Sequence, residues 1–123
     1  IMDNAASFLY ICILITYVVR EGDTAVLPCK LSNMLDVLYE MPHVKWNVDS
    51  KSVFERLGEG TSKGEGFEGR ADVPLDELLN GNCSLVLKDV RKSDAGDYES
   101  KLKVKVKGSK TWHNINNIKL SVK

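Results

Sequence analysis

The chain has 123 residues, of which 43% are apolar and 28% are charged, and its 17 basic and 17 acidic side chains leave no net charge. This length and apolar content predict one globular domain, over residues 1–123, with a core of its own. The balanced charge argues against a nucleic-acid partner, and three Pro, nine Gly and no low-complexity run leave no interdomain linker.

The cysteines form an odd set of three, Cys12, Cys29 and Cys83. In an extracellular domain of this size, an odd count indicates a free thiol, an intermolecular bridge or a pair broken by substitution. No C-x-x-C pair is present, and the histidines His43 and His113 are isolated in the sequence. We therefore expect neither a metal site nor a cofactor.

The apolar stretch Ser7–Val19, SFLYICILITYVV, has two interpretations. Its 13 residues are too few to span a bilayer as a helix, but they suit the core of a signal peptide. Against a signal peptide, no Lys or Arg precedes the stretch, Asp3 lies where positive charge is expected, and no small-x-small cleavage site precedes Arg20. Because Ile, Val, Thr and Tyr dominate, we favour a first strand buried against a sheet within residues 1–19, with a retained leader as the alternative.

Beyond Arg20, short runs of alternating apolar and polar residues predict strands separated by turns. The Gly-rich residues 58–69 are predicted to be loop or weak edge strand, and LDELL at 75–79 a single helical turn. The last two strands would pair as a hairpin around residues 107–110. The predicted strands are TAVLPCKL (24–31), HVKWNV (43–48), SVFERL (52–57), NCSLVLKDV (82–90), DYESKLKVKV (97–106) and NNIKLSVK (116–123). Many short strands at this spacing indicate a sandwich or barrel.

Five segments carry a resemblance to variable-type (V-set) immunoglobulin domains. In chain order, EGDTAVLPC, VKW, FEGR, SLVLKDVRKSDAGDY and IKLSV are similar to strands B, C, D, E–F and G of such domains. The similarity covers about Val18 to Lys123. It implies an all-β fold, an immunoglobulin-like two-sheet antiparallel β-sandwich.

The resemblance also implies structural roles for five residues. Cys29 matches the B-strand cysteine, Trp46 the buried C-strand tryptophan, and Tyr98 the tyrosine of the E–F corner. Arg70 and Asp94 match a pair that forms an ion pair across the bottom of such domains. We expect each of these side chains to hold the core or the corner together.

The sequence DAGDYES departs from the family pattern D-x-G-x-Y-x-C, because Ser100 occupies the place of the F-strand cysteine. The serine is either natural or introduced, and the usual bridge from Cys29 cannot form. Cys83 lies on the inward phase of the strand that neighbours the Cys29 strand, so a bridge between the two is one alternative. We favour free buried thiols, which behave as small hydrophobes.

The function predicted from these features is recognition. The sequence has no Cys/His or Ser/His constellation with identifiable partners and no phosphate loop, so we expect no enzyme and no small-molecule substrate. The resemblance implies an extracellular module of a cell-surface immune-regulatory or adhesion receptor, nearest to butyrophilin-like and costimulatory-ligand ectodomains. The partner would be a protein on another cell. The alternatives are homophilic adhesion through a homodimer, or a secreted binder without a membrane anchor.

V-type domains often bind through the exposed face of strands G, F, C and C′, which directs attention to the outward-phase residues of DYESKLKVKV and HVKWNV. Three lysines of the first run would form a row on that face. The row is either a solvated strand that discourages aggregation or a surface that steers an acidic partner. The predicted partner-binding residues are Lys45, Asn47, Glu99, Lys101, Lys103 and Lys105.

Asn82-Cys83-Ser84 is the only N-x-S/T sequence in the chain. Period-two alternation points Asn82 outward and Cys83 inward, so a secreted chain would offer Asn82 for glycosylation. The alternative is an unoccupied site, because a cysteine at the middle position and a folded strand both hinder access.

Overall fold

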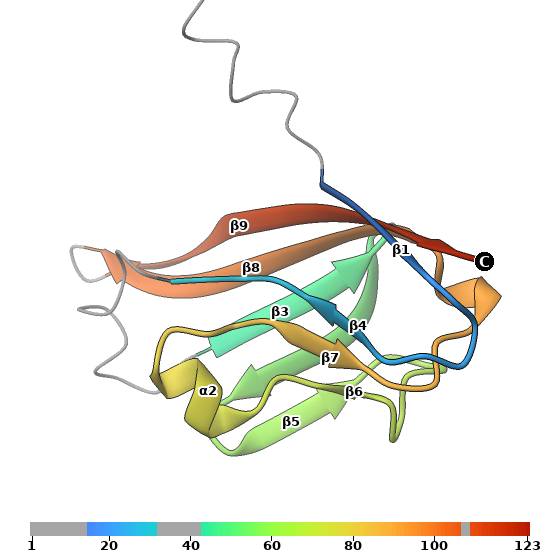
Figure 1. The fold of residues 1–123 in the computed structure, drawn as a ribbon. Helices are drawn as coiled ribbons and strands as arrows, with labels where there is room; N and C mark the ends of the chain where they lie inside the picture. Colours follow the sequence, from blue (N-terminus) through green and yellow to red (C-terminus); the bar gives the residue numbers. More distant parts are fainter. Residues whose placement is uncertain (1–14, 32–42, 107–108) are drawn as a thin grey trace, which may run out of the picture.

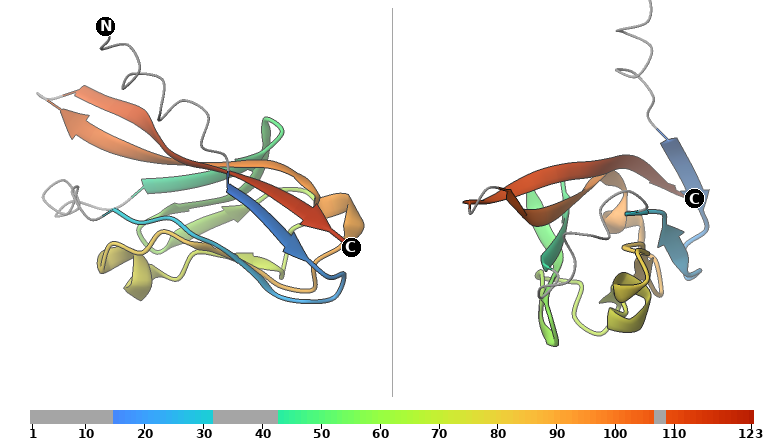
Figure 2. Two further views of the ribbon diagram at one scale, coloured as in Figure 1. Left: turned by 45° about the horizontal axis from the view of Figure 1, so that its top comes forward. Right: turned by 90° about the vertical axis from the view of Figure 1, so that its left-hand side faces the viewer.

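The computed structural model describes residues 15–31, 43–106 and 109–123, except for the side chains of residues 104–111. Its strands form two sheets that face each other, as Figures 1 and 2 show. The larger sheet has the strand order β1-β9-β8-β3-β4-β5, and the smaller has the order β2-β7-β6. All pairings between these strands are antiparallel except β1 with β9. The predicted all-β sandwich is confirmed.

The predicted strands occur in the expected order, with differences at several ends, and two short strands are added: β5 within the predicted loop or weak edge strand, and β6, which was not predicted. The larger sheet contains β1 (Ile15–Val19), β3 (His43–Val48), β4 (Lys51–Leu57), β5 (Gly60–Lys63), β8 (Gly96–Val106) and β9 (Ser109–Val122). The smaller sheet contains β2 (Ala25–Leu27), β6 (Ala71–Asp72) and β7 (Leu85–Leu87). A short helix, α2 (Leu75–Leu79), and a 3₁₀ turn, Lys92–Asp94, complete the described elements.

The core lies between the sheets and follows from the period-two alternation of the strands. In β3, Val44, Trp46 and Val48 point inward and are buried, and Leu85 and Leu87 meet them from β7. Because successive side chains of a strand point to opposite faces, the alternate residues are left on the outer surfaces. The core thereby fixes which side chains each sheet presents to solvent.

Strand β2 is shorter than the predicted run 24–31. It ends at Leu27, because the next ladder bond is replaced by side-chain contacts: Cys29 N–H donates to Ser84 Oγ, and the Cys83 carbonyl accepts from Trp46 Nε1. Beyond Leu27, pairing continues only as an isolated bridge between Lys30 and Asn82. Cys29 remains buried between these two points.

The predicted first strand is present at Ile15–Val19, whereas residues 7–14 of the predicted stretch lie outside the described residues. The expectation that this strand would be buried is wrong for the described part, since Val18 is 54% exposed. The reason is position: β1 is the edge strand beside β9, and only Tyr17 and Val19 pack against the core.

The Arg70–Asp94 ion pair expected at the bottom of the sandwich is present and buried. The guanidinium donates from Nη1 to Asp94 Oδ2 at 2.8 Å and from Nη2 to Asp94 Oδ1 at 2.9 Å. Its remaining hydrogen bonds go to backbone carbonyls of Gly66, Lys88 and Asp89. A planar bidentate pair of this kind is the strong form of an ion pair.

Electrostatics at this corner follows from those contacts. Burial alone would raise the pKa of Asp94, but hydrogen bonds from Arg70 and from the Arg91 backbone outweigh it and hold the pKa below its ordinary value. The hydrogen bond to Asp94 raises the pKa of Arg70. The Tyr98 hydroxyl donates to the Asp94 carbonyl at 2.6 Å, and burial raises the pKa of this hydroxyl.

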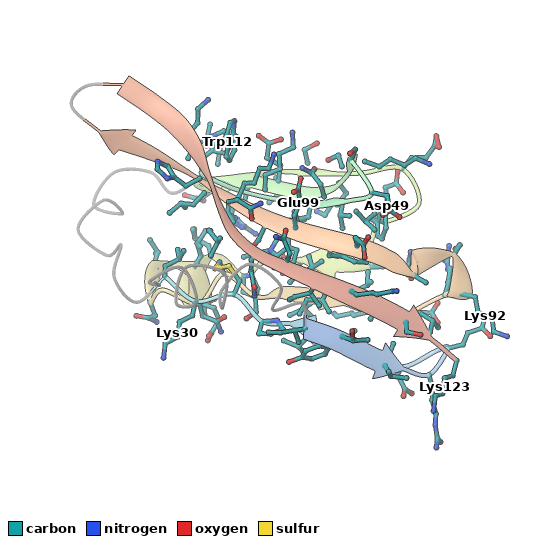
Figure 3. The ribbon with its side chains drawn as sticks, turned by 90° about the horizontal axis from the view of Figure 1, so that it is seen from above. Lys30, Asp49, Lys92, Glu99, Trp112 and Lys123 are labelled. Atoms are coloured by element: carbon teal, nitrogen blue, oxygen red, sulfur yellow. A yellow bond between two sulfur atoms is a disulfide. The ribbon has the colours of Figure 1, made fainter. Side chains whose placement is uncertain are left out.

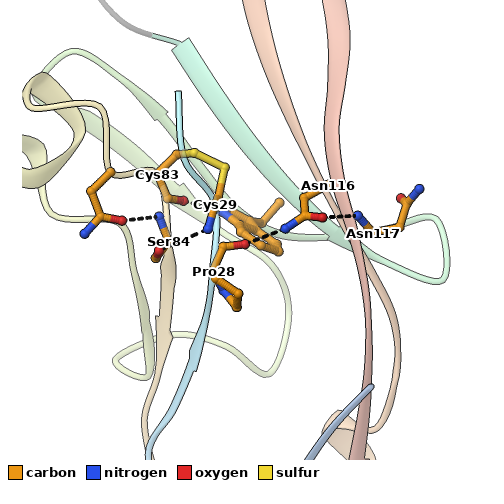
Figure 4. The surroundings of a disulfide bond; sticks show 8 residues. Pro28, Cys29, Cys83, Ser84, Asn116 and Asn117 are labelled. Carbon is orange, nitrogen blue, oxygen red and sulfur yellow. Dashed lines mark hydrogen bonds between the residues drawn. A yellow bond between two sulfur atoms is a disulfide. The ribbon is translucent and has the colours of Figure 1, made fainter. Parts of the chain in front are cut away.

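Cys29 and Cys83 form a disulfide, so the expectation of free buried thiols is wrong. The two residues belong to neighbouring segments of the smaller sheet, where Cys83 N–H donates to the Cys29 carbonyl at 3.0 Å. This backbone contact holds the Cα atoms 4.9 Å apart, within the range that a disulfide needs. The bridge therefore joins two neighbouring segments on the side of the smaller sheet, next to β2 and β7, where the usual bridge of the family would join two sheets (Figure 4).

Hydrogen bonds link the two sheets near this bridge. Trp46 Nε1 donates to the Cys83 carbonyl at 3.0 Å, and Asn116 Nδ2 donates to the Pro28 carbonyl at 2.7 Å (Figure 4). Ser100, opposite Trp46 in the sheet, is fully buried. Among the described side chains, its hydroxyl is the one buried polar group that lacks a hydrogen-bond partner.

Candidate partner-binding face

The outer side of the larger sheet carries four of the side chains predicted to bind a partner, those of Lys45, Glu99, Lys101 and Lys103. Strands β9, β8, β3 and β4 occupy the places of G, F, C and C′ in a V-type sandwich. The register sets Trp112 opposite Lys103, Lys101 opposite Lys45, and Lys45 opposite Glu55. Residues from three distant parts of the chain thus lie side by side.

Trp112, near the start of β9, is the largest exposed aromatic side chain of the described residues, at 37% exposure (Figure 3). The indole of Trp112 and the imidazole of His43 form an edge-to-face contact, with ring centroids 4.6 Å apart and an angle of 67° between the ring planes. The Lys103 ammonium lies 5.3 Å from the indole centroid, within range of a cation–π interaction. These neighbours hold the indole in place while leaving part of it open to solvent.

His43 connects this aromatic group to strand β4. Its Nε2 atom lies 2.6 Å from Glu55 Oε2, and both side chains are partly buried. Opposite His43 in the register is Leu57, which is 48% exposed. The apolar Leu57 and the aromatic Trp112 therefore lie beside the charged side chains of this sheet face.

We call this surface the basic–aromatic face. It combines cationic, aromatic and apolar side chains. Its members are His43, Lys45, Leu57, Lys101, Lys103 and Trp112.

The lysines of this face are not an uninterrupted positive row. Lys101 Nζ lies 3.5 Å from Glu99 Oε1, and Lys45 is opposite Glu55. The face is therefore basic but contains acidic groups between its lysines. The backbone of Lys105 belongs to β8, but its side chain lies outside the described ones.

Asn47 does not suit the predicted role of an exposed contact, because only 8% of it is exposed. It lies between Glu99 of β8 and Ser52 of β4 in the cross-strand register, and the register with β4 shifts next to it. This shift is a local irregularity that alternation within one strand cannot reveal. The prediction of Asn47 as an exposed partner-binding residue is therefore wrong.

Three members of the face were absent from the prediction: Trp112, His43 and Leu57. Trp112 was missed because the last strand was predicted to begin at Asn116, whereas β9 begins at Ser109. The residues around Trp112 are mostly polar and show no apolar alternation. Their strand structure is therefore evident only from their pairing with β8. His43 and Leu57 stood at the ends of correctly predicted strands, where their outward phase was the available signal.

Neither a metal centre nor a membrane-spanning helix emerges from the part of the chain that the structure describes. No group of three His, Cys, Asp or Glu residues there could hold a metal ion. None of the helices in that part is long and apolar enough to cross a bilayer.

The fold is shared with solved immunoglobulin variable-type domains. The human B7-H4 IgV-like domain superposes with a TM-score of 0.68 at 23% identity, covering 89% of this chain and 92% of that one. The structure of murine CRIg gives a TM-score of 0.69 at 20% identity, covering 88% and 92%. At such identities the likeness concerns the fold alone, and it defines the class as a V-type immunoglobulin sandwich.

Sequence comparison gives the family. The model of the immunoglobulin domain family matches residues 15–112, so the chain belongs to that family. It is similar to mouse programmed cell death 1 ligand 1, at 36% identity over 87 residues, covering 67% of this chain and 29% of that protein. It is also similar to the human sodium channel regulatory subunit beta-4, at 30% identity over 92 residues, covering 68% and 40%. The matched region spans less than half the length of either relative.

Proposed function

We propose that the chain is an extracellular recognition module of a cell-surface immune-regulatory or adhesion receptor, and that it binds a protein partner through the basic–aromatic face. The observation that carries the proposal is Trp112, an exposed indole held between His43 and the Lys103 ammonium on an open sheet. Tryptophan is enriched among the residues that dominate binding energy in protein interfaces. The similarity to a ligand and to a regulatory channel subunit supports recognition as the activity.

The charges of the face indicate an acidic partner. Lys45 and Lys101 are directly opposite each other in the register of β3 and β8, and Lys103 extends the cluster along β8. A local cluster of positive charge attracts an acidic surface even when the whole chain has no net charge, and it acts mainly on the association rate. The apolar Trp112 and Leu57 would supply the desolvated contacts at the flanks.

Homophilic adhesion is a second candidate that one observation favours. Glu55 and Glu99 lie on the same face as the lysines, within reach of them. A two-fold interface must be complementary to itself, and a face with both signs of charge meets that condition. Sedimentation of the chain alone over a range of concentrations distinguishes this case, because a homophilic face gives a dimer and a heterophilic face leaves a monomer.

The test of the proposed function uses tetramers of the chain against a panel of cell-surface ectodomains displayed on cells. The double reversal Lys101→Glu with Lys103→Glu should slow association with the true partner and flatten its salt dependence. The matched control is Lys30→Glu with Lys92→Glu, which changes the net charge equally at two exposed positions away from this face. Binding that survives the reversal at low salt, or that falls equally in the control, would place the site elsewhere.

A further inference from the structure

The sequon Asn82-Cys83-Ser84 is folded into the disulfide region of the domain. Asn82 is exposed, and its Nδ2 atom donates to Glu77 Oε1 at 2.9 Å while its Oδ1 atom accepts from Ser84 N–H at 3.1 Å. Cys83 is fully buried in its bridge to Cys29. The acceptor residue therefore faces solvent, while its neighbour is held in the core.

The hydroxyl of the sequon is also occupied. Ser84 Oγ accepts a hydrogen bond from Cys29 N–H at 3.1 Å, which ties it to the segment that bears the other half of the bridge (Figure 4). Once the domain has folded, the amide and the hydroxyl are engaged, and the segment between them is fixed by the bridge. A glycosyltransferase that must draw the sequon into its own site would have to break these contacts.

We propose that Asn82 is an acceptor for an N-linked oligosaccharide, and that its modification competes with closure of the Cys29–Cys83 bridge. This inference rests on the extracellular location in the proposed function, because both reactions belong to the secretory pathway. The glycan must be attached while Cys83 is still a free thiol. Chains in which the bridge closes first leave Asn82 bare, so both forms are produced.

The two competing reactions can be written completely. Asn82 Nδ2 forms a bond to C1 of the terminal sugar of a lipid diphosphate-linked oligosaccharide, the bond from C1 to the diphosphate oxygen breaks, and the amide loses one proton to a base. Bridge closure removes two protons and two electrons from the thiols of Cys29 and Cys83, and a disulfide oxidant of the compartment is reduced to two thiols. The first reaction needs an extended, accessible sequon, which the second removes.

The folded domain tolerates the glycan. The Asn82 amide nitrogen carries two hydrogens, so after attachment one remains to donate to Glu77. Asn82 and Ser84 share the outward phase of the smaller sheet with Val86, opposite the exposed Val26 of β2. The sugar would therefore cover the outer side of the smaller sheet and leave the basic–aromatic face free.

The test is the occupancy of Asn82 in the whole chain, expressed in eukaryotic cells behind a cleavable secretion signal. Total intracellular and secreted protein is deglycosylated enzymatically in heavy-oxygen water, and the peptide mass counts the converted Asn82. We expect partial occupancy in the wild type, a higher occupied fraction in Cys29→Ser, and the same rise when a brief pulse of reductant delays bridge formation. Asn82→Gln should carry no glycan.

A matched control is Cys12→Ser, which removes a cysteine outside the described residues and should leave the occupied fraction unchanged. Bare Asn82 in both the wild type and Cys29→Ser would overturn the acceptor site. Full occupancy in the wild type, or an equal rise in Cys12→Ser, would overturn the competition. Either failure leaves binding by the basic–aromatic face unaffected, because the lysine reversals measure that separately.

Discussion

The bottom corner and the centre of the sandwich differ in how fully their buried polar groups are hydrogen-bonded. At the corner, all three guanidinium nitrogens of Arg70 donate hydrogen bonds, and Asp94 and Tyr98 are satisfied in turn. In the centre, Ser100 is buried where the family pattern has a cysteine, and its hydroxyl finds no partner among the described groups. The corner has the arrangement expected from the family, whereas the centre has Ser100 in place of the expected second cysteine.

The two regions differ in how much change in their residues the fold tolerates. Removing either charge of the corner would leave the other buried without its oppositely charged partner. A disulfide can instead change partner, because Cys29 has a neighbour in its own sheet at a suitable distance. The cross-sheet hydrogen bonds of Trp46 and Asn116, together with the packed core, then join the two sheets.

The largest expected effect comes from breaking the corner. Arg70→Ala strands the buried Asp94 carboxylate, and we expect it to lower the free energy of unfolding by about 3–5 kcal/mol. Urea unfolding at neutral pH measures the change. Lys101→Ala is the control, because its contact with Glu99 is partly exposed and such pairs contribute roughly 0–1 kcal/mol. Equal losses in the two variants would show that the corner is no more important than a surface pair.

The next effect comes from removing the relocated bridge. Replacing both Cys29 and Cys83 with Ala should cost about 2–5 kcal/mol, because the bond closes a long loop in the unfolded chain. Restoring a link across the sheets, with Cys83→Ala and Ser100→Cys together, should recover part of that stability. Unchanged urea unfolding in the double-alanine variant under oxidising conditions would contradict a stabilising bridge.

Acid should weaken the corner before it affects the centre. The pKa of Asp94 is lower in the folded domain than its ordinary value of 3.8, so the folded state binds the proton less tightly than the unfolded chain. The stabilisation that ionised Asp94 gives to the folded domain is complete above a pH of about 3.8, its pKa in the unfolded chain. It is lost as the pH falls through the lower pKa of the folded domain. Thermal unfolding of the wild type against Asp94→Asn over this acidic range checks it. The variant should lose less stability on acidification, and parallel curves would assign the acid sensitivity to other carboxylates.

The smallest effect concerns the unpaired hydroxyl of Ser100. Ser100→Ala removes a buried polar group that has no partner to lose, so we expect no loss of stability or a gain of up to about 1 kcal/mol. Ser84→Ala is the matched control, because its hydroxyl accepts a hydrogen bond from Cys29 N–H and its removal should be destabilising. Destabilisation of similar size in both variants would mean that the Ser100 hydroxyl is satisfied in solution.

Sequence reasoning succeeded where a signal lies within one strand or one corner. Alternation alone located β3 and β7, and the family pattern led to Arg70 and Asp94. It failed where the outcome depends on register between strands distant in sequence. The choice of Cys83 as bridge partner and the burial of Asn47 both depend on such pairings.

The contact of His43 with Trp112 is a further case of this kind. It requires β9 to continue along β8 beyond the point where the apolar pattern ends. The pairing of β8 with β9 also shifts register between Ser100 and Lys101, which changes the phase of the residues beyond it. A pattern confined to one strand contains no information about either feature.

The basic–aromatic face is tested most directly by fluorine NMR of the chain labelled with 5-fluorotryptophan. The chain has two tryptophans, the buried Trp46 and the exposed Trp112, so two resonances are expected, and Trp112→Phe assigns them. Titration with the unlabelled partner, or with the chain itself if binding is homophilic, should shift or broaden the Trp112 resonance and leave that of Trp46 in place. A Trp112 resonance that stays unchanged at saturation would contradict binding through this face.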